Sequence, residues 1–211
     1  ACERVAAALG AQPDEVTFTS GATEANNLAV LGLAGRPPAR LMASHVEHPC
    51  VVEPLKRLEA DGFAVGWWPV DSRGVVVPGP VPPDTRLVCV MLANHETGAV
   101  QPVRDVAVSL PPGVRLHCDA AQAVGKIPVS FRDLGVTTLA ASAHKFGGPK
   151  GVGVLVTKRG TPLRPLMAGG HQQQGRRPGT EAVPLAAGMA AALEHATRNM
   201  AANRATLEAL R

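Results

Sequence analysis

The sequence predicts an α/β fold, a mostly parallel β-sheet flanked by helices. Short apolar segments of strand length alternate with longer segments of helical periodicity along the 211-residue chain. The strand-like segments are apolar at nearly every position, as expected for strands covered on both faces. The chain is 45% hydrophobic but only 3% aromatic, so small residues such as Ala, Val and Gly must do much of the packing.

The first half of the chain begins with a helix over 2–10. Its apolar residues Val5, Ala8 and Leu9 have helical spacing, and Gly10 is a typical helix stop. The segments that follow alternate in type: a strand over 15–20, a helix over 22–35, a strand over 40–44, a helix over 50–62 and a strand over 63–70.

The second half continues the alternation. The pattern predicts strands over 86–92, 114–119, 137–143 and 151–158, a short helix over 103–110 and an Ala-rich helix from Val183 to the end. The Pro-rich segments 35–40 and 78–85 read as surface loops. We expect one large domain over 1–211. The first residue is Ala1 and the last helix has no capping residue, which suggests a piece of a longer protein.

Composition argues against several classes of function. The net charge is +4, from 21 basic and 17 acidic residues, and the basic residues are scattered with few aromatics between them, so nucleic-acid binding is not expected. No apolar segment approaches membrane-spanning length. None of the four cysteines forms a CxxC pair, and we expect reduced thiols and a cytoplasmic location.

Polar residues follow the predicted strands at five places. In an open parallel sheet, ligands bind beyond the carboxyl ends of the strands, so five polar ends suggest one shared site. The residues are Thr23, His48, Asn94, His95, Asp119, Gln122, Ser142, His144 and Lys145.

The residue types in these positions fit pyridoxal 5'-phosphate. The "SGAT" turn leads into a helix, and backbone N–H groups at a helix N-terminus bind anions. Asp119 can hold a positive charge, and His48 offers a flat ring. Lys145 follows an apolar strand, where burial would lower the pKa of its amine and suit it to Schiff-base chemistry. A metal alternative, HxxHxC over 45–50, has no fourth ligand nearby.

These motifs resemble the class V aminotransferase-type enzymes of fold type I, and most of all the cysteine desulfurases and selenocysteine lyases. The matching segments run in order and at family-like spacing over nearly the whole chain: "FTSGATEANNLAV", "EHPCV", "NHETG", "HCDAAQAVGKIPV", "SAHKFGGPKGVGVL" and "RRPGTEAV". The resemblance implies the cofactor-binding large domain of such an enzyme, with 182–211 starting the connection to a small C-terminal domain.

The resemblance also implies roles for single residues. Lys145 would carry the cofactor as a Schiff base and later move the substrate proton, while Asp119 would pair with the pyridine nitrogen. His48 would stack on the ring and act as a catalytic residue by assisting proton transfer. Gln122 would hydrogen-bond the phenolic oxygen. The phosphate would be held by Ala22 (backbone), Thr23, Ser142 and His144. These enzymes resemble obligate homodimers, and Thr180 of each subunit would reach the phosphate bound in the other.

Two departures from the family pattern stand out. The family usually has a second Asn where this chain has His95, which can still donate a hydrogen bond to the cofactor. The pattern "GGGQER" becomes "GGHQQQ" over 169–174, near the expected dimer contact. Cys50 does not match the family's sulfur-accepting cysteine and reads as a helix-start residue. That cysteine and the arginine for the substrate carboxylate would lie beyond Arg211.

The expected reaction is removal of sulfur from L-cysteine to give L-alanine and an enzyme persulfide, which sulfur-acceptor proteins then use for iron–sulfur clusters or thiolation. L-Selenocysteine as substrate, or another class V reaction, is the alternative. A third reading is a truncated, inactive homologue that serves as a dimerisation module.

Overall fold

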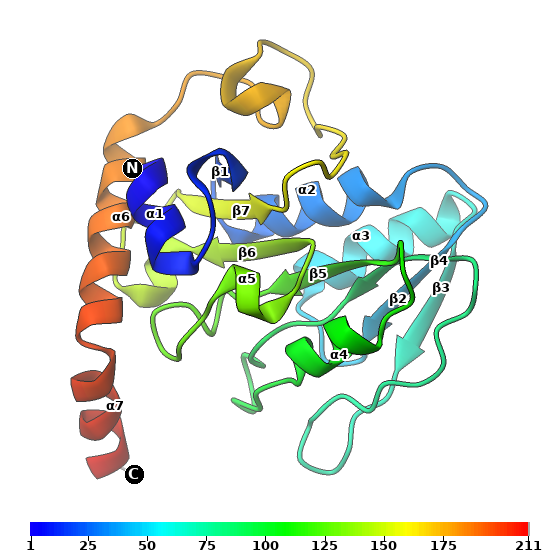
Figure 1. Ribbon diagram of the computed structural model, residues 1–211, viewed down its shortest axis with the longest axis horizontal. Coiled ribbons are helices and arrows are strands. Elements are labelled where there is room, and N and C mark those ends of the chain that lie inside the picture. The colour runs from blue at the N-terminus through cyan, green and yellow to red at the C-terminus, as the bar shows by residue number, and fades with distance from the viewer. Residues whose placement is uncertain (211) are drawn as a thin grey trace.

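Seven strands form one sheet in the computed structural model, which describes residues 1–210, and their order is β1-β7-β6-β5-β4-β2-β3 (Figure 1). The neighbouring strands β6, β5, β4, β2 and β3 are parallel, and β7 runs antiparallel to both β1 and β6. The predicted mostly parallel sheet is therefore confirmed. The strands are β1 (Val16–Thr19), β2 (Arg40–Ser44), β3 (Ala64–Trp68), β4 (Thr85–Cys89), β5 (Arg115–Asp119), β6 (Thr138–Ser142) and β7 (Gly153–Thr157).

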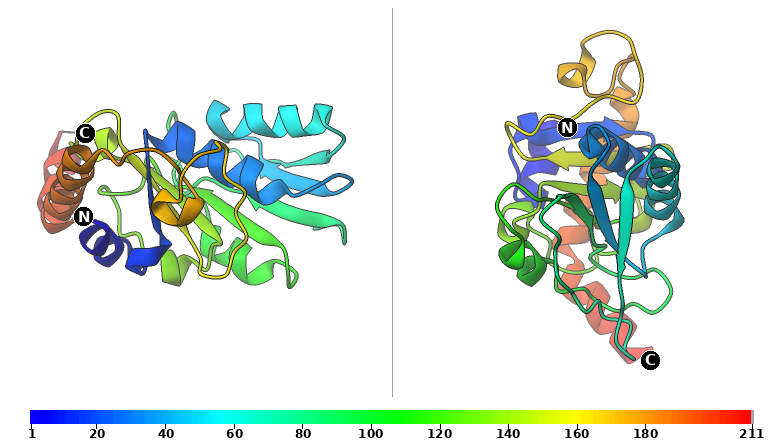
Figure 2. Two further views of the ribbon diagram at one scale, coloured as in Figure 1. Left: turned by 90° about the horizontal axis from the view of Figure 1, so that it is seen from above. Right: turned by 90° about the vertical axis from the view of Figure 1, so that its right-hand side faces the viewer.

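Helices cover both faces of this sheet (Figure 2). Residues of α2 (Ala22–Ala34) and α3 (Pro49–Ala60) join the apolar clusters on one face. The cluster on the other face includes residues from α1 (Cys2–Leu9), α4 (Val103–Ser109), α5 (Phe131–Leu134) and α6 (Val183–Arg198). Within β4, Leu87 and Cys89 belong to the first face and Val88 to the second, which explains the unbroken apolar strands.

Local sequence accounts for several element boundaries. Helix α1 ends at Gly10, whose left-handed φ of 65° lets its backbone N–H donate to the carbonyl oxygens of the last turn. Helix α3 begins at His48, whose ring nitrogen accepts the N–H of Cys50, and Pro49 occupies the first helical position. Helix α5 begins at Ser130, whose hydroxyl accepts the N–H of Asp133.

Some boundaries differ from the sequence-based expectations. The predicted continuous C-terminal helix is interrupted at Asn199, which separates α6 from α7 (Met200–Ala209). Asn199 has a φ of −97° and a ψ of 7°, and its side chain donates to the carbonyl of His195, so it competes with the helical ladder. The residue Arg211, at the end of the predicted helix, lies outside the described residues.

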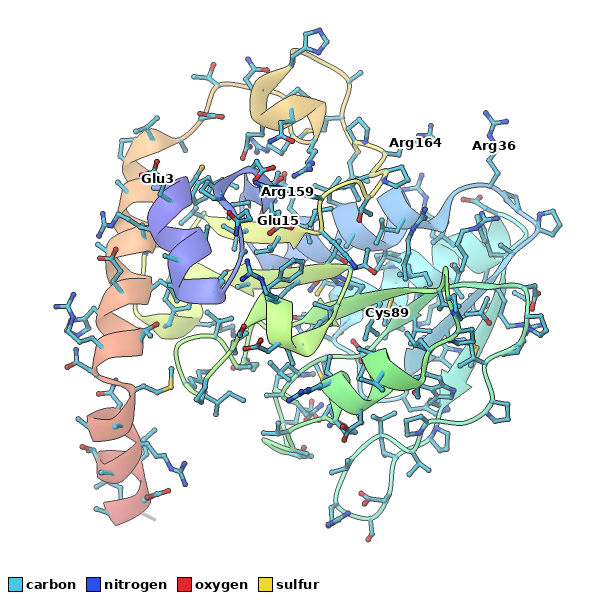
Figure 3. The ribbon with its side chains drawn as sticks, viewed as in Figure 1. Glu3, Glu15, Arg36, Cys89, Arg159 and Arg164 are labelled. Carbon is cyan, nitrogen blue, oxygen red and sulfur yellow. The ribbon has the colours of Figure 1, made fainter. Side chains whose placement is uncertain are left out.

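The four-residue helix α5 was not predicted, nor were the 3₁₀ turns η1 (Pro13–Glu15), η2 (Ala143–Phe146) and η3 (Gln172–Gly175). All four are shorter than two helical turns and carry no periodic signal. The predicted strand over 86–92 is shorter, because regular pairing of β4 ends at Cys89. Cys89 lies among the strands of the sheet (Figure 3).

The segment between β7 and α6 folds back over the edge strand β1 (Figure 1). Its Gln173 side chain accepts the backbone N–H of Phe18 at 2.5 Å and donates to the Phe18 carbonyl at 2.9 Å. One amide side chain thus replaces a neighbouring strand at this position. At the start of the segment, the Arg159 guanidinium pairs with Asp14 and its backbone N–H donates to Glu15 (Figure 3). Among the described residues, no helix has the length and apolar character needed to span a membrane.

Candidate active site

A cavity of about 480 Å³ opens at the carboxyl ends of the parallel strands. This volume falls within the usual range for small-molecule sites. Nine of the ten predicted site residues line it, each from the end of a strand or from the turn or helix start that follows a strand: Ala22, Thr23, His48, His95, Asp119, Gln122, Ser142, His144 and Lys145. Strand β1 runs parallel to β6, since both are antiparallel to β7, so its end reaches the same edge.

The wall at Ser20–Thr23 is the start of α2 and has free backbone donors. The N-cap residue is Gly21, and no side chain among the described residues caps this end. The N–H groups of the first turn are left for an anion, and the dipole of a 13-residue helix adds to their effect. Glu24 braces this turn, since its carboxylate accepts the Ser20 N–H at 2.7 Å and pairs with Arg177 at 2.9 Å.

Asp119 is the last residue of β5 and lies at the buried side of the cavity, 5% exposed. Its two carboxylate oxygens accept the backbone N–H of Ala121 at 2.9 Å and the amide of Asn26 at 2.8 Å. Burial raises the pKa of Asp119, while these two hydrogen bonds act in the opposite direction. A carboxylate in this position can hold a cationic or protonated ring group of a ligand.

His48 and His95 form the side of the cavity next to Asp119. Their rings lie edge to face, with centroids 5.0 Å apart and an interplanar angle of 70°. Burial lowers the pKa of His48, so its imidazole is neutral near pH 7. The Cys50 thiol is 2.9 Å from His48 Nδ1, and burial raises the pKa of this thiol to about 12.

Ser142, His144 and Lys145 come from the end of β6 and the η2 turn that follows it. Ser142 Oγ is 3.0 Å from His144 Nδ1, so the two side chains form one polar wall. The expectation that Lys145 is buried is wrong: the strand ends at Ser142, and Lys145 is exposed at the cavity mouth.

The remaining predicted residues have separate surroundings. Gln122 lines the cavity, and its Oε1 accepts a hydrogen bond from Lys126 at 2.6 Å. Asn94 does not line it; its Oδ1 instead accepts the N–H groups of Glu96 and Thr97 and shapes the turn that presents His95. Thr180 lies outside the cavity, on the exposed part of the 159–182 segment.

Two buried residues next to the cavity were missed by sequence reasoning. Asn26 is fully buried and touches both Asp119 and Cys50. Glu47 accepts hydrogen bonds from Ser44 and from the N–H of Met91, and burial raises its pKa to about 7. A polar residue on the buried face of a helix is a usable signal for Asn26, because the residues three and four positions later, Ala29 and Val30, are both apolar.

The HxxHxC segment does not gather into a metal site. His45 stacks on Trp67, with ring centroids 5.8 Å apart, while His48 and Cys50 contact each other. Within residues 1–210, no three His, Cys, Asp or Glu side chains are close enough to hold a metal ion. All four cysteines are free thiols.

Comparison with known proteins identifies close relatives of this chain. A cysteine desulfurase IscS from Dictyoglomus turgidum is 42% identical over 206 residues, which are 94% of this chain and 52% of the relative. A solved structure titled NifS-like protein superposes with a TM-score of 0.92 at 42% identity, over 95% of this chain and 57% of that one. The structure of SspA in complex with cysteine superposes with a TM-score of 0.88 at 36% identity, over 92% of this chain and 59% of that one.

The chain spans about half the length of the curated relatives it matches. The family model described as aminotransferase class-V matches residues 1–210, nearly the whole chain. The resemblance inferred from the six sequence motifs is thereby confirmed. With this match, the fold and the shared identity, the chain belongs to the class V aminotransferase family, and its near relatives are cysteine desulfurases.

Proposed function

We propose that the protein binds pyridoxal 5'-phosphate in the 480 Å³ cavity and acts as a cysteine desulfurase. The observation that supports this most is the convergence of three chemically different groups on one cavity. They are the uncapped N-terminus of α2, the Asp119 carboxylate and the Lys145 amine. Together they match the phosphate, the ring nitrogen and the aldehyde of this cofactor.

The donor set fits the cofactor at its anionic end. The N–H groups of Ala22 and Thr23, with the side chains of Thr23, Ser142 and His144, would hold the phosphate.

The other residues would orient and activate the cofactor. Asp119 would keep the ring nitrogen protonated, and His48, neutral and half-buried, would lie against the ring. Gln122 and His95 line the cavity and would donate to the ring's oxygen substituent. When bound, the cofactor supplies the electron-withdrawing ring that allows bonds at the substrate's α and β carbons to break. Lys145 would hold the cofactor and move a proton.

The proposed overall reaction converts L-cysteine and an acceptor thiol into L-alanine and a persulfide. The carbon–sulfur bond of cysteine breaks, a sulfur–sulfur bond forms, and the acceptor's proton passes to the new methyl group. Cysteine as substrate is supported by the names of the relatives and by the SspA complex, which holds cysteine. With dithiothreitol as acceptor, the sulfur leaves as sulfide, so an assay does not depend on a particular acceptor protein.

The test is alanine and sulfide production from L-cysteine by protein loaded with pyridoxal phosphate. We expect Lys145→Ala to lose at least about a thousandfold in rate, since it removes a group used throughout covalent catalysis. Lys56→Ala is the matched control, because Lys56 is exposed on α3, pairs with Glu53 and does not line the cavity. Equal rates for Lys145→Ala and wild type would overturn the proposal.

A further inference from the structure

A single buried amide, that of Asn26 on α2, connects the residues around the cavity. Its Nδ2 is 2.8 Å from Asp119 Oδ2 and 3.0 Å from Cys50 Sγ. Its Oδ1 is 2.9 Å from His117 Nε2, and His117 Nδ1 is 2.9 Å from Thr138 Oγ1. Asn26, His117 and Thr138 are each 0% exposed, so water does not compete for these hydrogen bonds.

The direction of each hydrogen bond follows from Asp119. Both of its carboxylate oxygens accept, so the NH₂ end of Asn26 must face Oδ2 and the carbonyl end must face His117. Because an amide oxygen can only accept, His117 carries its proton on Nε2. Burial lowers the pKa of His117 to about 3, so the ring is neutral and its Nδ1 accepts the Thr138 hydroxyl.

The other N–H of the Asn26 amide points to the thiol beside His48. Cys50 Sγ accepts this hydrogen bond, and the Cys50 backbone N–H donates to His48 Nδ1 at 3.1 Å. A backbone N–H is always a donor, so neutral His48 carries its proton on Nε2. Asn26 therefore contacts Asp119 directly and is linked to His48 through Cys50. These are the two residues proposed to contact the cofactor ring.

We propose that Asn26 is a positioning residue for Asp119, oriented by His117 and Thr138, and that its amide donates to the carboxylate and aims it at the cavity. The importance of Asn26 for catalysis rests on the proposed function, in which Asp119 faces the ring nitrogen. The hydrogen-bond directions are independent of that function, and they can be measured on the protein without cofactor.

The test is ¹⁵N NMR of the histidine rings in the full chain, together with the carboxyl ¹³C resonance of Asp119 as a function of pH. In wild type we expect His117 as the neutral Nε2–H tautomer. Asn26→Leu leaves Nε2–H buried without an acceptor, so the proton should shift to Nδ1 and donate to the Thr138 hydroxyl. Asn26→Asp keeps the acceptor and the tautomer. Both variants should raise the pKa of Asp119: each removes the amide donor, and Asn26→Asp also places a second carboxyl group beside it.

Asn27→Leu is the matched control on the same helix, since Asn27 donates to the Thr23 and Cys50 carbonyls and touches neither His117 nor Asp119. It should change neither readout. The other groups facing Asp119, namely His48, His95 and Cys50, are the same in every variant.

An Nδ1–H or charged His117 in wild type would overturn the proposal, and that measurement needs no variant to fold. An Asp119 that titrates identically in Asn26→Asp and wild type would overturn it as well. Failure of the protein to bind pyridoxal phosphate, with the expected NMR result, would count against the proposed function alone.

Discussion

Two buried carboxyl groups beside the cavity, Asp119 and Glu47, depend differently on their surroundings. Both oxygens of Asp119 accept hydrogen bonds, whereas Glu47 Oε2 has no partner among residues 1–210. Burial raises the pKa of both groups, and that of Glu47 reaches about 7. Glu47 is therefore protonated over part of the physiological range, and its ionisation disfavours the folded state.

The free energy of unfolding should reflect Glu47 with a definite sign. Between its ordinary pKa of 4.5 and the folded value of about 7, the folded state binds more protons than the unfolded state. Stability from this group is thus present at low pH and lost as the pH rises through 7. Glu47→Gln cannot ionise at this position, so the variant does not lose this stability as the pH rises. The free energy of unfolding of the variant minus that of wild type should therefore increase by about 3 kcal/mol from pH 4.5 to 8.

Urea unfolding of the two proteins at several pH values measures this difference. Glu59→Gln is the control, because Glu59 is exposed on α3, the helix that follows Glu47. A stability difference between Glu47→Gln and wild type that is flat with pH would show that Glu47 is ionised normally.

The thiols should differ in reactivity according to burial. Cys50, Cys89 and Cys118 are buried, and burial raises the pKa of each, to about 12 for Cys50. The thiolate is the nucleophile, so we expect iodoacetamide at pH 7.5 to modify the partly exposed Cys2 roughly tenfold faster or more. Peptide mass spectrometry gives the rates, and all four thiols should react in denaturant. Equal native rates at Cys50 and Cys2 would contradict this.

Single residues show where sequence reasoning succeeds and fails. Side chains that follow strands, such as Asp119 and His48, could be assigned to one cavity because strand ends of a parallel sheet share an edge. The burial of Lys145 was predicted wrongly, since its exposure depends on the η2 turn after β6. The role of Asn26 could not be predicted, because it depends on contacts with His117 and Asp119, which are 91 and 93 positions later in the sequence.

At the scale of elements, the cavity's anion-binding wall depends on how closely α2 approaches β7. A Cβ on Gly153 would lie 2.6 Å from the Gly21 carbonyl carbon and 2.7 Å from the Ala141 oxygen. Both contacts are with backbone, which cannot rotate away. Gly153 therefore allows the turn before α2 to lie against the sheet.

Gly153→Ala should destabilise the protein by about 1–3 kcal/mol, because the backbone must shift to accept the methyl group. It should also weaken pyridoxal phosphate binding, since the shift moves Gly21. Gly79→Ala is the control: its Cβ would meet only Trp68, at 3.7 Å. Denaturant unfolding gives the free energy of unfolding of each variant. Equal values for Gly153→Ala and Gly79→Ala would show that the contact between β7 and the turn before α2 has room for a methyl group.

Element types were predicted well where periodicity was strong. The buried strands β5, β6 and β7 and the helices α2 and α3 lie where their apolar patterns indicated. The break at Asn199 was missed, because Ala-rich sequence on both sides of it favours helix and the competing side-chain hydrogen bond is local. The position of β7 between β1 and β6 depends on long-range pairing, which no local pattern encodes.

For the whole molecule, we expect a second copy to pack against the segment over 159–183, where the family resemblance places the dimer contact. It exposes Leu166, Met167 and Val183, which are 41%, 43% and 64% exposed. Thr180, assigned by the family resemblance to a partner's phosphate, lies in the same segment.

If copies pair through this segment, light scattering should give about twice the chain mass of 21.8 kDa. Leu166→Asp should then shift the mass toward the monomer, because a charge in an apolar interface is costly. Val108→Asp is the control, on the exposed face of α4. A mass of 21.8 kDa at all concentrations would contradict pairing of this chain.

Whether Lys145 carries pyridoxal phosphate can be tested by borohydride reduction of the protein after incubation with the cofactor, followed by peptide mapping. We predict a phosphopyridoxyl group on Lys145 alone, because, of the two lysines that line the cavity with Asp119, it is the one that follows β6 in the family motif. Lys150 also lines the cavity and serves as an internal comparison. A folded protein that carries no label, or carries it on Lys150 or Lys126 instead, would contradict the account.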